Sequence, residues 1–372
     1  MGRLSYSLCF VFFGILLAFS WIVIMAVLLD LFSGCGGLTL GSHKAGFQTR
    51  LAIDVDPILS SSFPINFPST SFLNADISAL TSERLSELLP GGVDGVIGGP
   101  PCQAFSEMGR RRADDPRRTL LGEFFRVVRS VEPSFFLMEN VPGLLSSNNR
   151  QVLLDAINSL PSHWVVHEPI ILDASEYGAP TKRKRVFVFG FDHRKVAVPS
   201  LADIIKTNAA KVCVRDAIAD IDQCYPSTEF GLWEYSQQSR LSDYASRMRS
   251  GRGLFTGQQM TQHRPETVAR YSSVLPGSVD PVGKHKRLHW EGFCPTLRAG
   301  TGSDRGSYQA VRPLHPSEHR VITPREAARL QGFPDDFIFH DTVWHSFRMI
   351  GNSVSPLISE ALLKNIKDFI RL

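Results

Sequence analysis

Short apolar runs alternate with helical patterns along most of the chain. The runs predict strands at residues 27–32, 48–53, 93–97, 135–138 and 185–191. Between them, residues 120–131 have the apolar spacing of a helix, which Pro133 ends. Residues 323–326 (Thr-Pro-Arg-Glu) form a capping box with proline at the first helical position and predict a second helix. This alternation predicts an α/β fold built on a mostly parallel sheet.

The amino-terminal segment conflicts with this pattern. Residues 4–29 contain no charged side chain and are long enough for the roughly 20 apolar residues of a membrane-spanning helix. The run nevertheless continues without a linker into the first strand, and no signal-peptide cleavage site interrupts it. We therefore expect the working protein to start at Met25 and residues 1–24 to be an upstream extension, with no membrane association. A membrane anchor and an additional buried element are the alternatives.

Composition narrows the class of protein. With 372 residues, 43% hydrophobic and 20% charged, the chain is long enough for one large domain and a smaller companion. Its six cysteines include no Cys-x-x-Cys pair, which argues against a disulfide framework and a zinc ribbon. We predict no metal site and a cytoplasmic protein with reduced thiols.

Basic residues are concentrated in one region. Residues 193–320 carry 18 Lys and Arg against 12 Asp and Glu, while the whole chain has a net charge of only +4. This region also lacks clear periodicity. We expect a first domain over residues 25–192, an irregular second domain over 193–320, and a return to the first domain over 321–372. The basic excess fits a phosphate-contacting surface or a merely solvated one.

A glycine-rich loop follows the first predicted strand. Residues 32–37 (Phe-Ser-Gly-Cys-Gly-Gly) place free backbone N–H groups where a helix begins, which favours binding of a carboxylate or phosphate. Thr39 breaks the dinucleotide spacing Gly-x-Gly-x-x-Gly. Asp54 ends the second strand, and Asp76 and Ile77 follow further on. Each alone is explained by a turn or a helix cap, but together they indicate a cofactor that contains a nucleoside.

A cysteine and a carboxylate follow two other strands. Cys102 comes after Pro100 and Pro101, at the end of the strand over 93–97, where α/β proteins bind ligands. Glu139 ends the strand over 135–138 and is expected at the same edge. Because Cys102 follows a stiff Gly-Gly-Pro-Pro turn, in which burial is not expected, a nucleophile is favoured over a buried structural thiol.

Six motifs together resemble the ordered motif set of DNA cytosine-5 methyltransferases. They are residues 32–37, Pro101-Cys102-Gln103, Glu139-Asn140-Val141, Arg183-Lys184-Arg185, Arg325 with residues 331–334, and residues 351–354. The resemblance extends from Val27 to the carboxyl terminus except for a variable stretch within 193–295. It implies a Rossmann-like methyltransferase domain that uses S-adenosylmethionine, and a target-recognition domain over 193–320.

The resemblance also implies the chemistry. C5 of cytosine is a poor nucleophile, so a thiolate first adds to C6 of a base that is flipped out of the duplex. That thiolate is Cys102. Glu139 acts at N3 and Arg185 near O2, and Arg183 supports the site or binds phosphate.

The resemblance assigns two further sets of residues. The cofactor contacts are Phe32, Gly34, Gly36, Asp54, Asp76, Ile77, Pro101, Leu120, Asn352 and Ser353. The DNA contacts are Gln103, Ser106, Arg110, Arg111, Arg112, Thr296, Leu297 and Arg298, with a basic loop over 107–118. Two departures from the family pattern are Thr181, where glutamine is usual, and Asp54, where glutamate is usual.

Two other functions stay open. One is an RNA cytosine-5 methyltransferase on the same fold, and the other is a catalytically inactive, membrane-tethered nucleic-acid-binding protein. The expected partner is double-stranded DNA, and a cognate restriction endonuclease acting on the same site is a further candidate. Because the reaction treats one base at a time, a monomer suffices.

Overall fold

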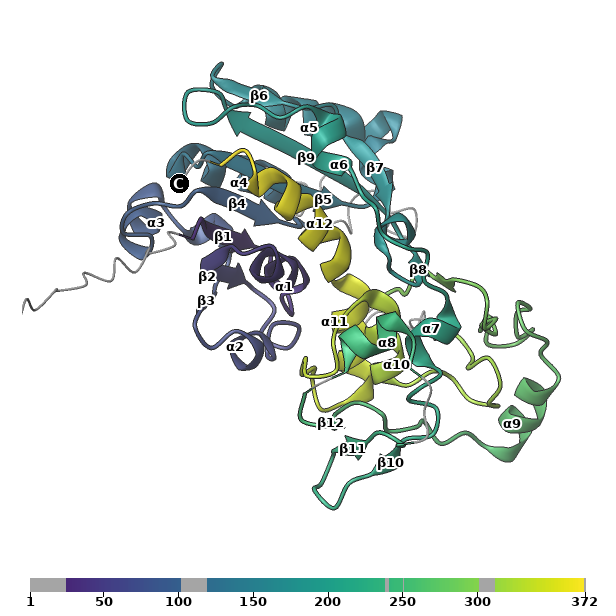
Figure 1. The fold of residues 1–372 in the computed structure, drawn as a ribbon. Coiled ribbons are helices and arrows are strands. Elements are labelled where there is room, and N and C mark those ends of the chain that lie inside the picture. The colour runs from purple at the N-terminus through teal and green to yellow at the C-terminus, as the bar shows by residue number, and fades with distance from the viewer. Residues whose placement is uncertain (1–24, 102–118, 238–240, 250, 301–311, 371–372) are drawn as a thin grey trace, which may run out of the picture.

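A central sheet organises the protein. The computed structural model describes residues 25–101, 119–237, 241–249, 251–300 and 312–370 (Figure 1). The strand order is β3-β2-β1-β4-β5-β9-β6, and β7 also pairs with β9. The strands are β1 Val27–Leu31, β2 Gln48–Asp54, β3 Ser71–Asn74, β4 Gly95–Gly98, β5 Phe135–Asn140, β6 Trp164–Val166, β7 Ile170–Asp173 and β9 Lys184–Asp192. The predicted α/β fold with a mostly parallel sheet is confirmed.

All five predicted strands are present, but the last one runs in the opposite direction to the others. β1 to β5 pair in parallel, whereas β9 is antiparallel to β5, β6 and β7. Phe187 and Phe189 of β9 pack on one face of the sheet, while Val186 and Val188 pack on the other. A strand buried on both faces has a continuous apolar sequence in either direction, so the pattern does not encode the direction.

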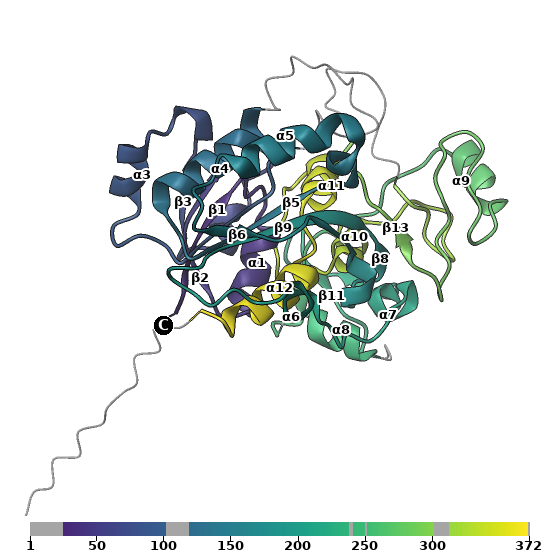
Figure 2. The same ribbon diagram turned by 90° about the horizontal axis from the view of Figure 1, so that it is seen from above.

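Helices cover both faces of the sheet (Figure 2). On one face lie α3 Ser82–Leu88, α4 Thr119–Val131 and α5 Ser147–Asn158. On the other lie α1 Gly37–Lys44, α6 Leu201–Ile205 and α12 Pro356–Lys367. The carboxyl-terminal helix α12 therefore packs beside α1, which follows the first strand.

A second lobe lies beside the sheet, at the lower right of Figure 1. Its helices are α7 Val214–Ile218, α8 Asp243–Met248, α9 Pro265–Ser272, α10 Pro324–Gln331 and α11 Val343–Asn352. Its short strands are β10 Tyr225–Pro226, β11 Trp233–Glu234, β12 Leu254–Phe255 and β13 Cys294–Pro295, and β13 pairs with β8 Thr181–Lys182. Helix α2 Phe63–Asn66 borders this lobe. One hydrophobic cluster joins α7, α8, α10 and α11.

The predicted capping box starts α10. The Thr323 hydroxyl accepts a hydrogen bond from Glu326 N (3.2 Å), and the Glu326 carboxylate accepts one from Thr323 N (2.8 Å). At the other end, buried Arg329 forms ion pairs of 2.5 Å with both Asp220 and Asp335. These contacts fix α10 against α7.

The expectations about a membrane span, the cysteines and a metal site can be compared with the structure only for the residues that it describes. No helix in the described ranges is long and apolar enough to cross a membrane, and residues 1–24 lie outside those ranges. The cysteines at 35, 213, 224 and 294 are free thiols. Within the same ranges, no group of His, Cys, Asp and Glu is arranged to hold a metal ion.

The crossing of α1 and α12 depends on a glycine. A Cβ atom added at Gly41 would lie 1.8 Å from Ser359 Oγ and 2.6 Å from Glu360 N. By contrast, a Cβ at Gly122 on α4 would meet no atom within 4 Å.

We expect Gly41→Ala to lower the free energy of unfolding by about 1–3 kcal/mol, because the added methyl overpacks this crossing. Gly122→Ala should raise it by about 0.5–1 kcal/mol, since alanine favours an exposed helix. Urea unfolding measures both variants. Equal effects in the two variants would contradict a close α1–α12 contact.

Candidate active site

Three loops meet at the carboxyl edge of the sheet. β1, β4 and β5 are neighbouring parallel strands, so their carboxyl ends lie side by side. The glycine loop follows β1, the segment through Pro101 follows β4, and Glu139 and Asn140 end β5. The structure therefore brings the glycine loop, the segment that ends at Pro101 and Glu139 to the same edge of the sheet, as predicted. Cys102 lies outside the described residues.

The glycine loop has an unusual backbone and an open side. Phe32, Gly34 and Gly36 all have positive φ (58°, 52° and 95°). For Phe32 this conformation is strained, and such strain concentrates at binding sites. A Cβ at Gly36 would lie 2.3 Å from the Phe67 ring, so Gly36 is required by packing. A Cβ at Gly34 would meet nothing within 4 Å, which leaves room for a ligand.

Asp54 holds this loop in place. Its Oδ2 accepts a hydrogen bond from Gly34 N (2.7 Å), and its Oδ1 accepts one from Asp56 N (2.8 Å). Burial raises the pKa of Asp54, while these N–H donors oppose the rise. The carboxylate therefore connects the end of β2 to the loop after β1.

Asp30 is a second buried carboxyl group under the loop, and the sequence analysis did not single it out. It is fully buried and accepts a hydrogen bond of 2.5 Å from Thr39 Oγ1. Burial raises the pKa of Asp30 to about 7, the hydrogen bond from Thr39 opposes this, and nearby Asp54 adds to it. The signal in the sequence was an aspartate inside an otherwise apolar strand.

Glu139 and Arg185 form an ion pair at the edge. Glu139 Oε1 and Arg185 Nε lie 2.8 Å apart, and both side chains are largely buried. Burial raises the pKa of Glu139, and the positive charges of Arg185 and then Arg183 act against the rise. Asn140 of β5 pairs with Val186 of β9 in the antiparallel ladder, and this register places the neighbouring Glu139 and Arg185 side chains together.

The same carboxyl group borders the segment that leads to Cys102. A Cβ at Gly99 would lie 3.2 Å from Glu139 Oε2. Asn140 Nδ2 donates a hydrogen bond of 3.1 Å to Pro100 O. Asn140 thus anchors this segment to β5, a role that the sequence analysis missed, although the residue was part of a recognised motif.

Arg183 is used differently from Arg185. Its guanidinium is buried and donates to three carbonyl oxygens: those of Leu297 (2.9 Å), Gly351 (2.8 Å) and Ser353 (2.8 Å). Gln331 Nε2 also donates to Ser353 O (3.0 Å). Arg183 therefore joins the strand region, the second lobe and the segment before α12.

The remaining predicted cofactor residues surround this edge. Asp76 is exposed and caps a short 3-10 helix through Ser78 N, while Ile77 is buried and its carbonyl accepts a hydrogen bond from Arg126 of α4. Asn352 is exposed at the end of α11. Partly buried members of the set are Pro101, Leu120 and Ser353.

The predicted DNA contacts divide into two groups. Gln103, Ser106, Arg110, Arg111 and Arg112, with the rest of the loop over 107–118, lie outside the described residues. Thr296 is partly exposed and Arg298 exposed, but the Leu297 side chain is buried with only 3% exposure.

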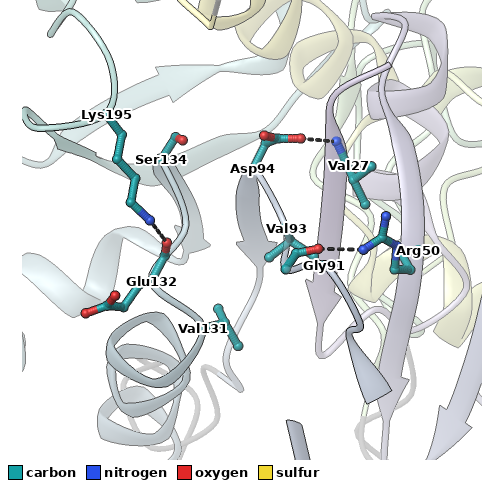
Figure 3. Close-up of a pocket in the computed structure, with 10 residues that line it drawn as sticks. Val27, Arg50, Gly91, Val93, Asp94, Val131, Glu132, Ser134 and Lys195 are labelled. Atoms are coloured by element: carbon teal, nitrogen blue, oxygen red, sulfur yellow. Dashed lines mark hydrogen bonds between the residues drawn. The ribbon is translucent and has the colours of Figure 1, made fainter. Parts of the chain in front are cut away.

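A surface pocket of about 330 Å³ lies at the opposite edge of the sheet (Figure 3). It is lined by residues at the amino ends of β1, β4 and β5, among them Val27, Asp94 and Ser134, together with Lys195. Because Gly34 and Glu139 are at the carboxyl edge, this pocket is separate from the candidate site.

The fold and the site define an α/β protein with a glycine-rich loop after its first strand and a carboxylate–guanidinium pair near that loop. Residues 26–368 match the model of the C-5 cytosine-specific DNA methylase family, and the chain belongs to that family. The resemblance seen in the sequence is confirmed, and the chain is a DNA methyltransferase.

Relatives and solved structures agree with this assignment. The chain is 37% identical to the Type II methyltransferase M.XorII of Xanthomonas oryzae pv. oryzae, over 92% of this chain and 85% of the relative. It is 32% identical to M.DdeI of Desulfomicrobium norvegicum, over 91% and 88%. A structure described as a DNA modification methyltransferase encoded within an E. coli prophage is 34% identical, with a TM-score of 0.78 and coverage of 92% and 99%. The S. pombe Dnmt2 methyltransferase shares the fold at 18% identity, with a TM-score of 0.63 and coverage of 92% and 98%.

Asp30 should make stability depend on pH. Its carboxyl ionises near pH 3.8 in the unfolded chain and near pH 7 in the folded protein. The stabilisation that protonated Asp30 gives the folded protein is therefore complete below pH 3.8 and is lost as the pH rises to about 7, by about 1.4 kcal/mol per pH unit. The Asn side chain of Asp30→Asn does not titrate. As the pH rises through this range, we therefore expect the variant to become more stable relative to the parent. At higher pH the difference in unfolding free energy between the two proteins should be constant.

Urea unfolding at pH 5, 6, 7 and 8 measures this difference. In Thr39→Val the hydrogen bond that lowers the pKa of Asp30 is lost, so the range in which stability falls should extend to higher pH. A difference between Asp30→Asn and the parent that does not vary with pH would refute the assignment.

Proposed function

We propose that the protein transfers a methyl group from S-adenosylmethionine to C5 of a flipped cytosine within a specific sequence of duplex DNA. The transfer proceeds through a covalent bond between Cys102 and C6 of the base. The observation that carries this proposal is the buried pair of Glu139 and Arg185 beside the segment that leads to Cys102.

The residues at the carboxyl edge fit the cofactor. The open side of Gly34 lets a ligand approach the backbone, and the strained Phe32 borders the same loop. Asp54 has oxygen lone pairs left for ribose hydroxyls beyond its two backbone contacts. Asp76 and Ile77 would hold the adenine end, and Pro101, Leu120, Asn352 and Ser353 would complete the site. S-adenosylmethionine supplies an electrophilic methyl group there.

The chain's own residues activate the base. The Cys102 thiolate adds to C6, which makes C5 nucleophilic and places negative charge toward N3 and O2. Glu139 donates a proton or hydrogen bond at N3, and its raised pKa favours the protonated form that this role requires. Arg185 stabilises the charge near O2 and orients Glu139. Arg183 supports both groups through its carbonyl contacts. Once C5 carries the methyl group, loss of the C5 proton to water breaks the bond between Cys102 and C6 and releases 5-methylcytosine.

Binding of the duplex completes the proposal. Flipping the base costs a few kcal/mol, which contacts with DNA offset. We assign these contacts to Gln103, Ser106, the arginines at 110–112, Thr296 and Arg298, and a supporting role to buried Leu297. Residues 193–320 include the target-recognition domain, although α6 within them packs on the sheet, and α10 and α11 of the segment 321–372 pack in the second lobe. The protein acts as a monomer and protects its site from a cognate restriction endonuclease.

Cys102→Ala should abolish methyl transfer, with a loss of at least ~10³-fold, because the nucleophile is removed. The assay uses labelled S-adenosylmethionine with duplex DNA or with RNA. Cys213→Ala, which changes a partly buried thiol of the second lobe, is the matched control and should keep full activity. DNA containing 5-fluorocytosine should trap the parent as an adduct at Cys102. Label in RNA only, or activity in Cys102→Ala, would overturn the proposal.

Gly34→Ala should raise the KM for S-adenosylmethionine about tenfold or more, because its methyl enters the space proposed for the cofactor. Gly92→Ala is the control, since Gly92 also has positive φ (71°) and an open side but lies at the amino edge. Both variants carry similar backbone strain. The measurement is the rate of methyl transfer by each variant as a function of the S-adenosylmethionine concentration. An equal rise of the KM in the two variants would contradict the assignment.

A further inference from the structure

A second pocket lies where β8 meets the second lobe. It has a volume of about 290 Å³ and is lined by Lys182, Lys286, Leu288, His289 and Phe293, with Arg287 and two glycines. Lys182 belongs to β8, whereas the other named residues belong to the irregular region. The basic pocket therefore combines two segments that are about 100 positions apart in the chain.

The backbone around the basic pocket is firmly held. β8 pairs with β13, with Lys182 opposite Pro295, and Thr296 Oγ1 donates to Lys182 O (2.7 Å). On the other side, Arg287 is buried and donates to the carbonyl oxygens of Tyr271 (2.7 Å), Val274 (2.7 Å), His315 (2.7 Å) and Glu318 (2.8 Å). Arg287 thus fixes the chain from which its neighbour Lys286 projects.

The lysines of the pocket lack a counter-charge. Lys182 and Lys286 are exposed, and neither takes part in an ion pair among the described residues. None of the described lining residues is acidic. The nearby Glu291 pairs with Arg215 (2.5 Å), and Asp280 pairs with Arg270 (2.8 Å). The Lys182 ammonium lies over the Phe293 ring, 5.7 Å from its centroid, but neither lysine has a carboxylate partner among the described residues, so this concave surface favours an anionic ligand.

The pocket is also close to the reacting groups. Lys182 directly precedes Arg183, and Arg185 follows three positions later and pairs with Glu139. An extended chain advances roughly 3.3 Å per residue, so Lys182 lies about 10 Å along the backbone from Arg185. In duplex DNA, about 10 Å of helix axis corresponds to three phosphates of one strand.

We propose that the basic pocket binds one backbone phosphate of duplex DNA, within about three nucleotides of the cytosine that is methylated. This inference rests on the proposed function. Lys182 and Lys286 both contact this phosphate, one from the strand that carries Arg183 and Arg185 and one from the second lobe. The contact is independent of base sequence and positions the duplex relative to Glu139 and Arg185.

Salt dependence of DNA binding tests this assignment. Release of counterions makes log K fall with log [salt] at a slope of about 0.9 per phosphate contact. For the double variant Lys182→Gln/Lys286→Gln, the slope of log K against log [salt] should be shallower than that of the parent by about 0.9. Each single variant should reduce this slope by no more than about 0.9. The loss should be equal on DNA with and without the recognised site, and the KM for DNA should rise while kcat is kept.

Lys195→Gln is the matched control. Lys195 is also an exposed pocket lysine, but its pocket lies at the amino edge of the sheet (Figure 3), so the parent slope should be retained. Thermal unfolding confirms that each variant is folded.

Two outcomes would overturn the inference. An unchanged slope and affinity would exclude a contact with DNA. A lower affinity with the parent slope would indicate that an unstacked base, packed against Phe293, occupies the pocket instead. Methyl transfer by the parent is measured in the same preparation, because a parent that does not methylate DNA disproves the proposed function rather than this pocket alone.

Discussion

Glu139 and Arg185 lie 2.8 Å apart where the antiparallel strand β9 runs beside the parallel strand β5. Two charged groups in a largely buried place are costly unless they neutralise each other. Their pairing therefore requires that both strands keep their register, and the extensive apolar packing of β5 and β9 supplies that rigidity. The same position puts the carboxyl group next to Gly99, so one interaction couples the core of the sheet to the segment that leads to Cys102, the nucleophile in our proposal.

The loop that binds the cofactor in our proposal depends on a comparable arrangement of buried polar groups. Asp54 connects β2 to the loop, and Asp30 lies beneath it with Thr39 as its hydrogen-bond donor. The raised pKa values of both carboxyl groups show that the fold tolerates unfavourable burial here. Together with the strained Phe32, they concentrate energetically unfavourable groups at one loop, as is common at binding sites.

Arg183 and Arg287 perform similar structural tasks in different places. Each is buried and donates to carbonyl oxygens of several segments, which connects parts of the chain that are remote in sequence. An arginine suits this task because its planar guanidinium offers five donors in fixed directions. The exposed neighbours of these two residues, Lys182 and Lys286, are thereby brought to one surface. Buried arginines thus position the exposed lysines that we propose to contact DNA.

The sequence alone determined five strands of the central sheet, the capping box at Thr323 and the order of motifs that identifies the family, because these are local patterns within a few residues. It did not predict β3, β6 and β7, which are short. It also placed Glu139 at the carboxyl edge, since the ends of parallel strands meet there. Only the tertiary structure decided the antiparallel direction of β9, the supporting contacts of Arg183 and the meeting of Lys182 with Lys286. Those features depend on packing between distant segments, and periodicity carries no information about which distant segments pack together.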